Sequence, residues 1–186
     1  MNKTDEKIMD AALKLFAENG YVGTGTRFIA EEAGFSEMTL FRKFKTKENL
    51  FHRVLIKNQK KVLNDFNSIV TNQEINDPKD GLKILFENLF EKMEDNFQFI
   101  TIIINERARI REFRDVNIEE IISYLGQYLK KQNIFKDSKI NSQIFALNIF
   151  SFLYFLIVDK KGGKSLINHY KAIDEFINYF NSSLLP

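Results

Sequence analysis

The sequence predicts an all-α protein of about nine helices. Apolar residues recur at spacings of three and four along most of the chain, and few segments alternate between apolar and polar residues. Only two prolines occur, Pro78 and Pro186, so few helices are interrupted. We expect an N-terminal three-helix domain with a helix-turn-helix at residues 1–50. A C-terminal helical bundle is expected at residues 51–186.

The composition limits the classes of protein to consider. With 186 residues, 44% of them hydrophobic, the chain can form one sizeable core or two small ones. It has no cysteine, which excludes a disulfide framework and a thiolate metal site. The first residues, MNKTDEK, are polar, which favours a cytoplasmic protein over an exported one. The longest apolar run, residues 144–158, is shorter than the ~18–20 residues of a membrane span. We therefore expect a core helix there and no membrane.

The first 50 residues are expected to form three short helices, over residues 5–19, 26–33 and 37–44. Each has an apolar face at helical spacing. Gly20 and Gly34 can adopt the left-handed conformation that ends the first two. The residues assigned to caps are Thr24 or Thr26, Ser36 and Thr46, and those assigned to the core are Ile8, Ala12, Leu15, Phe16, Ile29, Ala30, Ala33, Leu40 and Phe44.

A long helix from Thr46 to about residue 70 is expected to connect this domain to the bundle. A polar stretch with Asp-Pro and Gly turn signals follows at residues 71–81. Five helices are expected after it. Their ranges are 82–93, 97–113, 117 to about 129, 140–159 and 165–183, and a capping box of Asn117 and Glu120 begins the third.

The last predicted helix has the regular spacing of a packing seam, with apolar residues every three or four positions. The helix before it is apolar almost all round, so it should be buried on most sides. This pair predicts half of a two-fold four-helix bundle, and we expect a homodimer. The residues assigned to its interface are Phe152, Phe155, Leu166, Tyr170, Ile173, Ile177, Phe180 and Leu184.

Positive charge is concentrated in one stretch of the chain. Residues 42–61 contain eight basic residues and one acid, a local charge of +7. Because the whole chain carries +2, the remainder carries −5. A basic band beside a slightly acidic body is typical of DNA-binding proteins, although a solvated helix surface would have the same composition.

The helix at 37–44 is the predicted reader of the helix-turn-helix, since the second helix of that motif enters the major groove. Arg42 can pair with a guanine edge, and Thr39 with a thymine methyl or a base edge. Lysines around this helix can bind phosphates, and alternatively they are ordinary surface charges while Phe41 belongs to the core. The residues assigned to double-stranded DNA are Thr26, Ser36, Glu37, Met38, Thr39, Phe41, Arg42, Lys43, Lys45 and Lys47.

The run IMDAALKLFAENGYVGTGTRFIAEEAGFSEMTLFRKFKTKENLF resembles the DNA-binding domain of the tetracycline-repressor (TetR/AcrR) family of transcription regulators. The resemblance covers about residues 7–55. It rests on Ala11-Ala12, Leu15-Phe16, Gly20-Tyr21, Thr24, Ile29-Ala30, Ala33-Gly34, Ser36, Thr39-Leu40, Phe44, Lys47-Glu48 and Leu50. It implies a DNA-binding regulator whose divergent helical body binds a ligand and dimerises through its last two helices.

The reader helix departs from the family pattern at three positions. The family usually has glycine where Met38 stands, tyrosine where Phe41 stands, and often a lysine or another polar residue where Glu37 stands. Phe41 lacks the hydroxyl that commonly contacts a phosphate. Glu37 brings a negative charge, which can instead accept a hydrogen bond from a cytosine amino group. These departures concern the operator sequence rather than DNA binding as such.

The C-terminal half supplies aromatic residues for a lipophilic pocket, although an aromatic stripe can equally be plain core. A buried Glu106 would favour a cationic ligand and a buried Arg107 an anionic one. The candidate ligand residues are Phe97, Ile100, Ile103, Asn105, Glu106, Arg107, Tyr124, Gln127, Tyr128, Asn148 and Phe152. The two histidines, His52 and His169, are far apart in sequence, and no catalytic, metal or cofactor motif occurs, so no enzyme is expected.

Two functions fit these patterns. The first is a homodimeric repressor that binds a palindromic operator and is released by a small lipophilic effector. The alternative is an architectural or partner-recruiting DNA-binding protein without a small-molecule pocket. Apolar cavities of a few hundred Å3 in the body would favour the first.

Overall fold

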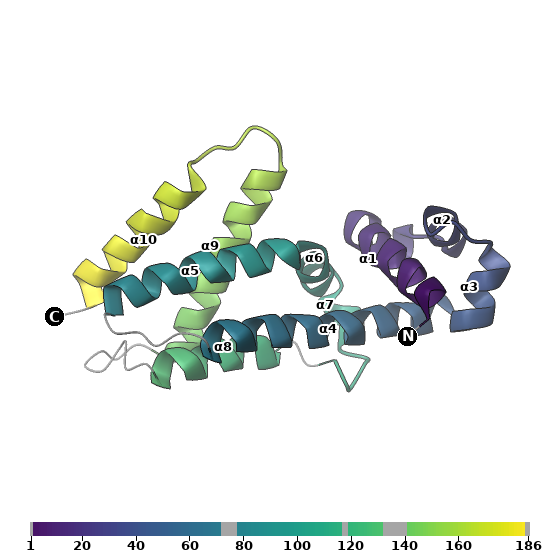
Figure 1. Ribbon diagram of the computed structural model, residues 1–186, viewed down its shortest axis with the longest axis horizontal. Helices are drawn as coiled ribbons and strands as arrows, with labels where there is room; N and C mark the ends of the chain where they lie inside the picture. The colour runs from purple at the N-terminus through teal and green to yellow at the C-terminus, as the bar shows by residue number, and fades with distance from the viewer. Residues whose placement is uncertain (1, 72–77, 117–118, 132–140, 185–186) are drawn as a thin grey trace. The chain divides into compact units, whose positions relative to one another are not determined.

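A computed structural model describes residues 2–71, 78–116, 119–131 and 141–184 (Figure 1). These residues form ten helices and no strand, so the predicted all-α fold is confirmed for the described chain. The helices are α1 (Lys3–Gly23), α2 (Thr26–Glu32), α3 (Glu37–Phe44), α4 (Lys47–Thr71), α5 (Pro78–Asp95), α6 (Phe97–Asn105), α7 (Arg107–Ile110), α8 (Glu119–Lys131), α9 (Ser142–Lys161) and α10 (His169–Leu184). The predicted capping residue Asn117 lies outside the described residues.

Residue contacts divide the chain into two compact units. The head unit contains Met1–Lys61 and Asn96–Asn117, and the body unit contains Val62–Asp95 and Ile118–Pro186. The predicted boundary after residue 50 separates segments that pack together. Phe51 at the start of α4 is fully buried against Phe16 of α1, and α6 also packs on α1. The head unit therefore includes the start of α4 and all of α6 and α7.

Helix α1 is interrupted one turn before its end. Gly20 has φ 69° and ψ 172°, a conformation that favours glycine. The helix then continues for one more turn and ends at Gly23, with Thr24 as its C-cap. The buried hydroxyl of Thr24 donates to the carbonyls of Leu15 and Gly20 at 2.9 and 2.7 Å. Thr24 thus closes the end of α1. The prediction that Thr24 or Thr26 caps α2 is wrong, because the N-cap of α2 is Gly25 and no side chain caps this helix.

Helices α2 and α3 are joined by a short turn (Figure 1). Ser36 caps α3 as predicted, because its Oγ accepts the N–H of Thr39. Leu40 and Phe44 are fully buried, which confirms the predicted inner face of α3. Thr46 accepts the N–H of Asn49 at 3.0 Å and so caps α4, also as predicted. These contacts fix the direction of the outer face of α3.

The single helix predicted over residues 97–113 is wrong. It is broken at Glu106, where φ is −105° and ψ is 20°, and two helices, α6 and α7, replace it. The predicted start of the last helix at residue 165 is also wrong, since α10 begins at His169. Neither break coincides with a proline, and at Glu106 the side chain is bound elsewhere in the head unit, as described below.

The body unit is built on the packing of α9 with α8 and α5, while α5 also packs on α10. Gly126 of α8 allows a close approach to α9, because a Cβ at this position would lie 3.2 Å from the Gln143 Cα. Aromatic stacking joins α9 and α10, with the rings of Phe152 and Phe176 4.1 Å apart and nearly parallel. One core thus includes side chains from all these helices.

Helix α9 exposes one apolar face. The 20 residues of α9 are long and apolar enough to cross a membrane, whereas the apolar run at residues 144–158 that was used for the prediction is shorter. Core helices of soluble proteins meet the same criteria of length and composition. Ala146, Ile149 and Leu153 are fully buried on one face. The opposite face exposes Ile144, Leu147, Phe155 and Val158. The expectation that this helix is buried on most sides is therefore wrong for a single chain.

Candidate nucleic-acid interface

The outer face of α3 presents a mixed set of apolar and charged side chains. Met38 is 79% exposed and Phe41 is 42% exposed, while Arg42 is exposed near the end of the helix. The alternative assignment of Phe41 to the core is therefore not supported. Because Leu40 and Phe44 hold the inner face against the head, these three side chains point away from it. They form the part of α3 that is available to a base edge.

The predicted DNA contacts at the start of α3 are bonded to one another. Ser36 Oγ lies 3.1 Å from Thr39 Oγ1, so the two hydroxyl groups share a hydrogen bond. Thr26 Oγ1, at the start of α2, donates to Glu37 Oε1 at 2.6 Å. The structure thus brings four of the predicted residues together in two pairs. Sequence spacing alone could not predict either pair.

Part of the basic band is neutralised within the head unit. Asp5 of α1 lies 3.1 Å from Lys43 Nζ and 3.8 Å from Arg53 Nη2. Lys57 pairs with Asp10 at 2.7 Å. Arg42 and Lys45 are exposed and face solvent, and Lys45 has a φ of 66°, a conformation that costs a non-glycine residue about 1–3 kcal/mol. The density of free positive charge is therefore lower than the sequence suggests, and it is concentrated at the end of α3.

Lys47 lies over an aromatic ring at the first turn of α4. Its Nζ is 4.4 Å from the centre of the Tyr21 ring, and the Arg109 guanidinium lies 4.1 Å from the same centre. Burial, and then the nearby charge of Arg109, lower the pKa of Lys47, while Glu106 acts in the opposite direction. The predicted phosphate ligand is therefore in electrostatic contact with α7.

Glu106 connects the break between α6 and α7 to the interrupted end of α1. Its Oε1 accepts the backbone N–H of Tyr21 at 2.7 Å, directly after Gly20. Its other oxygen lies 3.7 Å from Arg109 Nε. The sequence identified Glu106 as a ligand candidate and Tyr21 only as part of the family resemblance. A contact across 85 residues leaves no local signal in the sequence.

The remaining ligand candidates are divided between the two units. In the head unit, Ile100 and Ile103 are buried, whereas Asn105 and Arg107 are exposed and Phe97 is half-buried. In the body unit, Tyr128 is buried, and burial raises the pKa of its hydroxyl. Gln127 and Asn148 of that unit are exposed, and Phe152 and Tyr124 are half-buried and engaged with Phe176 and Asn67. The polarity of a ligand site therefore stays a prediction.

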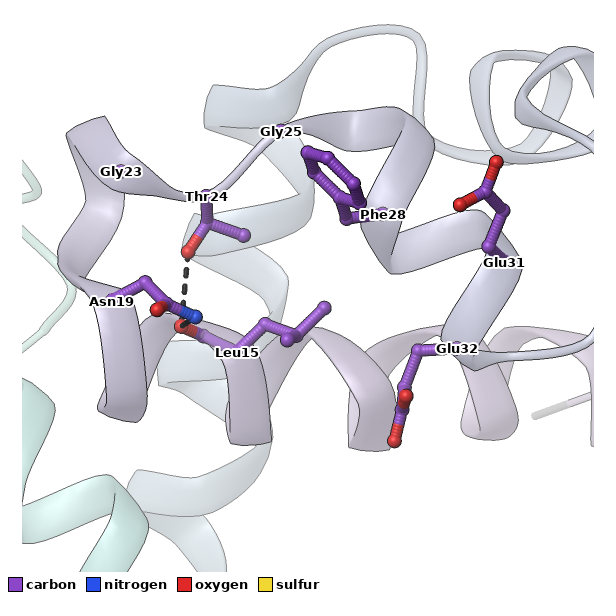
Figure 2. A pocket seen from close by; sticks show the side chains of 8 residues that line it. All are labelled: Leu15, Asn19, Gly23, Thr24, Gly25, Phe28, Glu31 and Glu32. Atoms are coloured by element: carbon purple, nitrogen blue, oxygen red, sulfur yellow. Dashed lines mark hydrogen bonds between the residues drawn. The ribbon is translucent and has the colours of Figure 1, made fainter.

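A groove of about 560 Å3 lies between the end of α1 and α2 in the head unit (Figure 2). Phe28 supplies an apolar wall, and Glu31 and Glu32 an acidic one. Their carboxylates pair with Arg27 and Lys14 respectively. None of the predicted ligand or DNA residues lines this groove, and its carboxylates make it unsuitable for phosphate.

The predicted dimer residues have mixed surroundings. Ile173 and Ile177 are 1% and 5% exposed within a single chain, so their assignment to an intermolecular seam is corrected: the body unit already covers them. Phe152, as noted, also faces its own unit, and so does Phe180, whose ring meets the Phe145 ring edge to face at 4.6 Å. The Leu184 side chain lies outside the described part. The exposed large apolar residues in the described part of this region are Ile144, Leu147, Phe155, Val158, Leu166, Ile167, Tyr170 and Tyr179.

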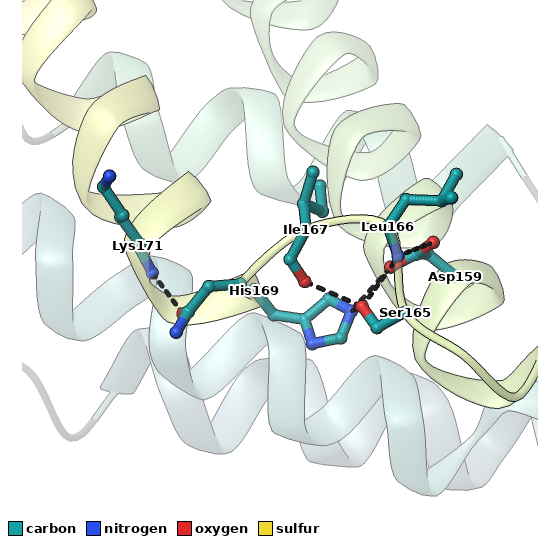
Figure 3. Close-up of polar contacts among 7 residues, drawn as sticks. Asp159, Ser165, Leu166, Ile167, His169 and Lys171 are labelled. Carbon is teal, nitrogen blue, oxygen red and sulfur yellow. Dashed lines mark hydrogen bonds and ion pairs between the residues drawn. The ribbon is translucent and has the colours of Figure 1, made fainter.

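Asp159, Ser165 and His169 cluster where α9 leads into α10 (Figure 3). Ser165 Oγ donates to Asp159 Oδ2 at 2.5 Å, and His169 Nε2 lies 3.1 Å from the same oxygen. In a nucleophilic triad, the histidine uses different nitrogens for serine and aspartate. Here one nitrogen faces both residues and serine bonds directly to aspartate. Since Asp159 also accepts the N–H of Leu166 at 3.0 Å, the cluster fastens the connection between two helices.

Residues 8–54 match the family model of bacterial regulatory proteins, tetR family. The chain is 36% identical over 128 residues to YvkB, an HTH-type transcriptional regulator of Bacillus subtilis, a match that spans 69% of this chain and 61% of YvkB. It is 29% identical over 106 residues to YerO, another HTH-type regulator of that organism, spanning 57% and 37% of the two chains. The chain thus covers less than two thirds of each relative.

The fold agrees with solved structures over nearly the whole chain. A putative fatty acid metabolism regulator of Clostridium perfringens has a TM-score of 0.73 and 28% identity, and the match covers 94% of this chain and 95% of that one. AibR, solved in complex with isovaleryl coenzyme A and operator DNA, has a TM-score of 0.75 at 15% identity, covering 95% and 97%. At that lower identity the likeness shows the fold alone.

Proposed function

Because this chain belongs to the tetR family of bacterial regulatory proteins, we propose that it is a homodimeric, ligand-responsive transcriptional repressor. In this proposal two head units bind a palindromic operator. A small lipophilic effector binds in the body and releases the protein from DNA. The observation that carries the proposal is the capped reader helix α3, whose exposed Met38, Phe41 and Arg42 lie beside the positive charges of Lys45 and Lys47.

The DNA contacts divide into two kinds. Arg42 has the fork of donors that matches a guanine edge, and the apolar side chains of Met38 and Phe41 match thymine methyl groups. Lys45 and Lys47 lie at the end of α3 and the start of α4, where they can bind phosphates on either side of the groove. Lys43 is a weaker candidate, because a phosphate has to compete with Asp5 for its ammonium group.

Dimerisation is proposed through the exposed apolar face of α9. Ile144 and Leu147 lie one turn apart on that face, and Phe155 and Val158 lie about two turns further along it. An exposed apolar face of this length favours a protein partner. A second copy would bury the same face on both chains. Two heads bound to a palindromic operator would lie one DNA turn apart, about 34 Å.

Two observations favour a lipophilic effector. The C. perfringens protein, at 28% identity over nearly the full chain, is described as a putative fatty acid metabolism regulator. The aromatic and aliphatic residues of the bundle also favour an apolar ligand. Fatty acids and their thioesters are therefore the first compounds to test.

The coupling between effector and DNA is proposed to run through α6 and α7. These helices belong to the head unit and hold two of its elements directly: Glu106 binds the end of α1, and Arg109 shares the Tyr21 ring with Lys47. An effector that displaces α6 or α7 would disturb the first turn of α4 through these contacts. Such an effect requires that the effector binds the two states with different affinity.

A titration of the full chain against labelled duplex DNA tests this proposal. The duplexes are the DNA upstream of the protein's own gene and a scrambled sequence of equal length, each with and without long-chain acyl thioesters. We expect tighter binding to the upstream DNA and at least roughly tenfold weaker binding with effector. Specific DNA binding that responds to no small molecule, with a solid bundle, would favour the architectural alternative.

A further inference from the structure

The hydroxyl groups at the start of the reader helix are already engaged. Ser36 Oγ accepts the Thr39 N–H at 3.3 Å and shares a second hydrogen bond with the Thr39 hydroxyl at 3.1 Å. Both residues thereby complete the N-terminal cap of α3. A base that bonded to either hydroxyl would have to compete with this cap. The reading of bases by the first turn of α3 therefore depends on other side chains.

Only two charged side chains of α3 remain for base recognition. Lys43 Nζ lies 3.1 Å from Asp5 Oδ1, which leaves Arg42 and Glu37. Arg42 is located in the last turn and Glu37 in the first. In a helix-turn-helix, the N-terminal residues of the second helix contact the base edges. Glu37 is therefore the charged residue of α3 at the position where the second helix of a helix-turn-helix contacts base edges.

The Glu37 carboxylate is held in place before DNA arrives. Thr26 Oγ1, at the start of the preceding helix, donates to its Oε1 at 2.6 Å in a half-buried site. A glutamate side chain loses up to about 2 kcal/mol of conformational entropy when it is fixed, and this contact has already fixed it. A carboxylate has about four lone-pair sites, so this bond leaves capacity for a second donor.

The major groove offers few donors to a carboxylate. Guanine presents two acceptors, O6 and N7, which repel it, and thymine presents an acceptor and a methyl group. Adenine has an amino group, but its N7 acceptor lies beside it. Cytosine presents its N4 amino group without a neighbouring acceptor. A fixed carboxylate at this place therefore discriminates in favour of cytosine and against guanine.

We infer that Glu37 is a specificity-determining residue that selects a cytosine in each half-site of the operator, with Thr26 as its positioning residue. The inference rests on the proposed function, since it assumes that α3 enters the major groove. The adjacent Met38, which is highly exposed and apolar, fits a thymine methyl next to that cytosine. The competing explanation is purely structural: an acidic residue in the first turn stabilises a helix through its dipole.

The experiment is selection of duplexes from a randomised pool by the full chain, followed by affinity measurements on single-base variants of the selected site. The proteins are the wild type, Glu37→Gln, Glu37→Ala and Thr26→Val. Glu31→Gln is the matched control, because it removes one carboxylate from the neighbouring α2, where Glu31 pairs with Arg27. Circular dichroism and thermal melting verify that each variant is folded.

The wild type should enrich cytosine at one position of each half-site, and replacement of that base should weaken binding roughly tenfold. Glu37→Gln should enrich adenine there, because an amide bonds to both N6 and N7 of adenine. Glu37→Ala should show no preference at that position, and Thr26→Val a reduced one. Glu31→Gln should select the wild-type site.

If the wild type, Glu37→Gln and Glu37→Ala all select the same operator sequence, the inference is overturned, even if the variants melt at lower temperature. Wild-type enrichment of no sequence at all contradicts the proposed function instead. The two failures are therefore distinguishable: the first leaves a selected operator and the second leaves none.

Discussion

Glu106 Oε1 accepts a hydrogen bond from the backbone N–H of Tyr21 at 2.7 Å, at the place where Gly20 interrupts α1. The bond joins the break between α6 and α7 to the helix that supports the reader. Without it, the freed N–H of Tyr21 would lack its helical acceptor in a half-buried site. Glu106 therefore has a structural partner inside the head unit, and its charge is compensated there by Arg109.

Replacement of Glu106 tests this contact. Glu106→Ala leaves a half-buried N–H without an acceptor, so it should lower the free energy of unfolding by roughly 1–3 kcal/mol. Glu106→Gln keeps a carbonyl acceptor and should lose less. Urea denaturation followed by circular dichroism measures both, with Glu91→Ala on the exposed surface of α5 as the control. Equal stability of Glu106→Ala and Glu91→Ala would contradict the role assigned to this bond.

Lys47 is expected to bind phosphate without reading sequence. Lys47→Ala should weaken binding to every duplex and reduce the slope of log affinity against log salt concentration by about one. Arg42→Ala should instead relax base choice, with a loss of about 1–3 kcal/mol on the preferred site alone. Anisotropy titrations at several salt concentrations, on specific and scrambled DNA, separate the two effects. Identical behaviour of the two variants would show that this division of roles is wrong.

The position of Lys47 also predicts a pH dependence of DNA binding. Burial and the charge of Arg109 lower its pKa below the 10.5 of an ordinary lysine, whereas a bound phosphate favours the charged form and raises the pKa again. The DNA-bound state therefore holds the proton more tightly. The contribution of Lys47 to affinity is complete below its pKa in the free protein, and it is lost as the pH rises from there through the higher pKa of the DNA-bound state. Arginine stays charged over this range, so Lys47→Arg should lose less affinity than the wild type as the pH rises from neutral towards the 10.5 of an ordinary lysine. Equal losses of DNA affinity by the wild type and by Lys47→Arg would contradict this prediction.

Phe155 is the test position for the proposed dimer surface. It is 55% exposed at the centre of the apolar face of α9, and Phe155→Glu would bring two carboxylates together in a two-fold interface. We expect dimerisation at least roughly tenfold weaker, measured by sedimentation equilibrium. Ile84→Glu is the matched control, because Ile84 has a similar exposure of 49% on α5. A Phe155→Glu protein that stays dimeric would exclude this face.

The connection between α9 and α10 should weaken in acid. Hydrogen bonds from the Ser165 hydroxyl and the Leu166 N–H, and then from His169, lower the pKa of Asp159 below that of an ordinary aspartate. A carboxyl whose pKa is lowered by folding stabilises the protein above its unfolded-state value, and this contribution disappears as the pH falls through the folded pKa. Asp159→Asn lacks that contribution. When the pH is lowered from about 5 to 2, the Tm of both proteins should fall, and the decrease should be a few degrees smaller for Asp159→Asn than for the wild type. The control is Asp95→Asn, and an equal change in all three proteins would contradict the prediction.

Local signals predicted the head well. The bounds of α3 agree with those expected from Ser36 and from the apolar pair of Leu40 and Phe44, because a cap and an inner face act within a few residues. The resemblance of this segment to its family is confirmed by the family model over residues 8–54. What spacing could not supply is the set of partners, since Asp5 for Lys43 and Thr26 for Glu37 depend on how helices pack.

Signals that depend on distant contacts were missed. The break at Glu106 has no glycine or proline, and it is accompanied by a bond to a residue 85 positions earlier. The spacing of Ile173 and Ile177 identified an apolar face of α10 but could not decide whether the same chain or a partner covers it. In the structure the same chain covers these two side chains. The candidate partner surface lies instead on α9, where periodicity was least informative because the helix is apolar on all sides.

The most direct test of the account is the stoichiometry and affinity of the full chain on DNA from the upstream region of its own gene. The account predicts two chains per palindromic site, by analytical ultracentrifugation with labelled DNA. It also predicts an affinity at least roughly 1,000-fold higher than for scrambled DNA of the same length at physiological salt. Equal affinity for upstream and scrambled DNA, or one chain bound per site, would contradict it.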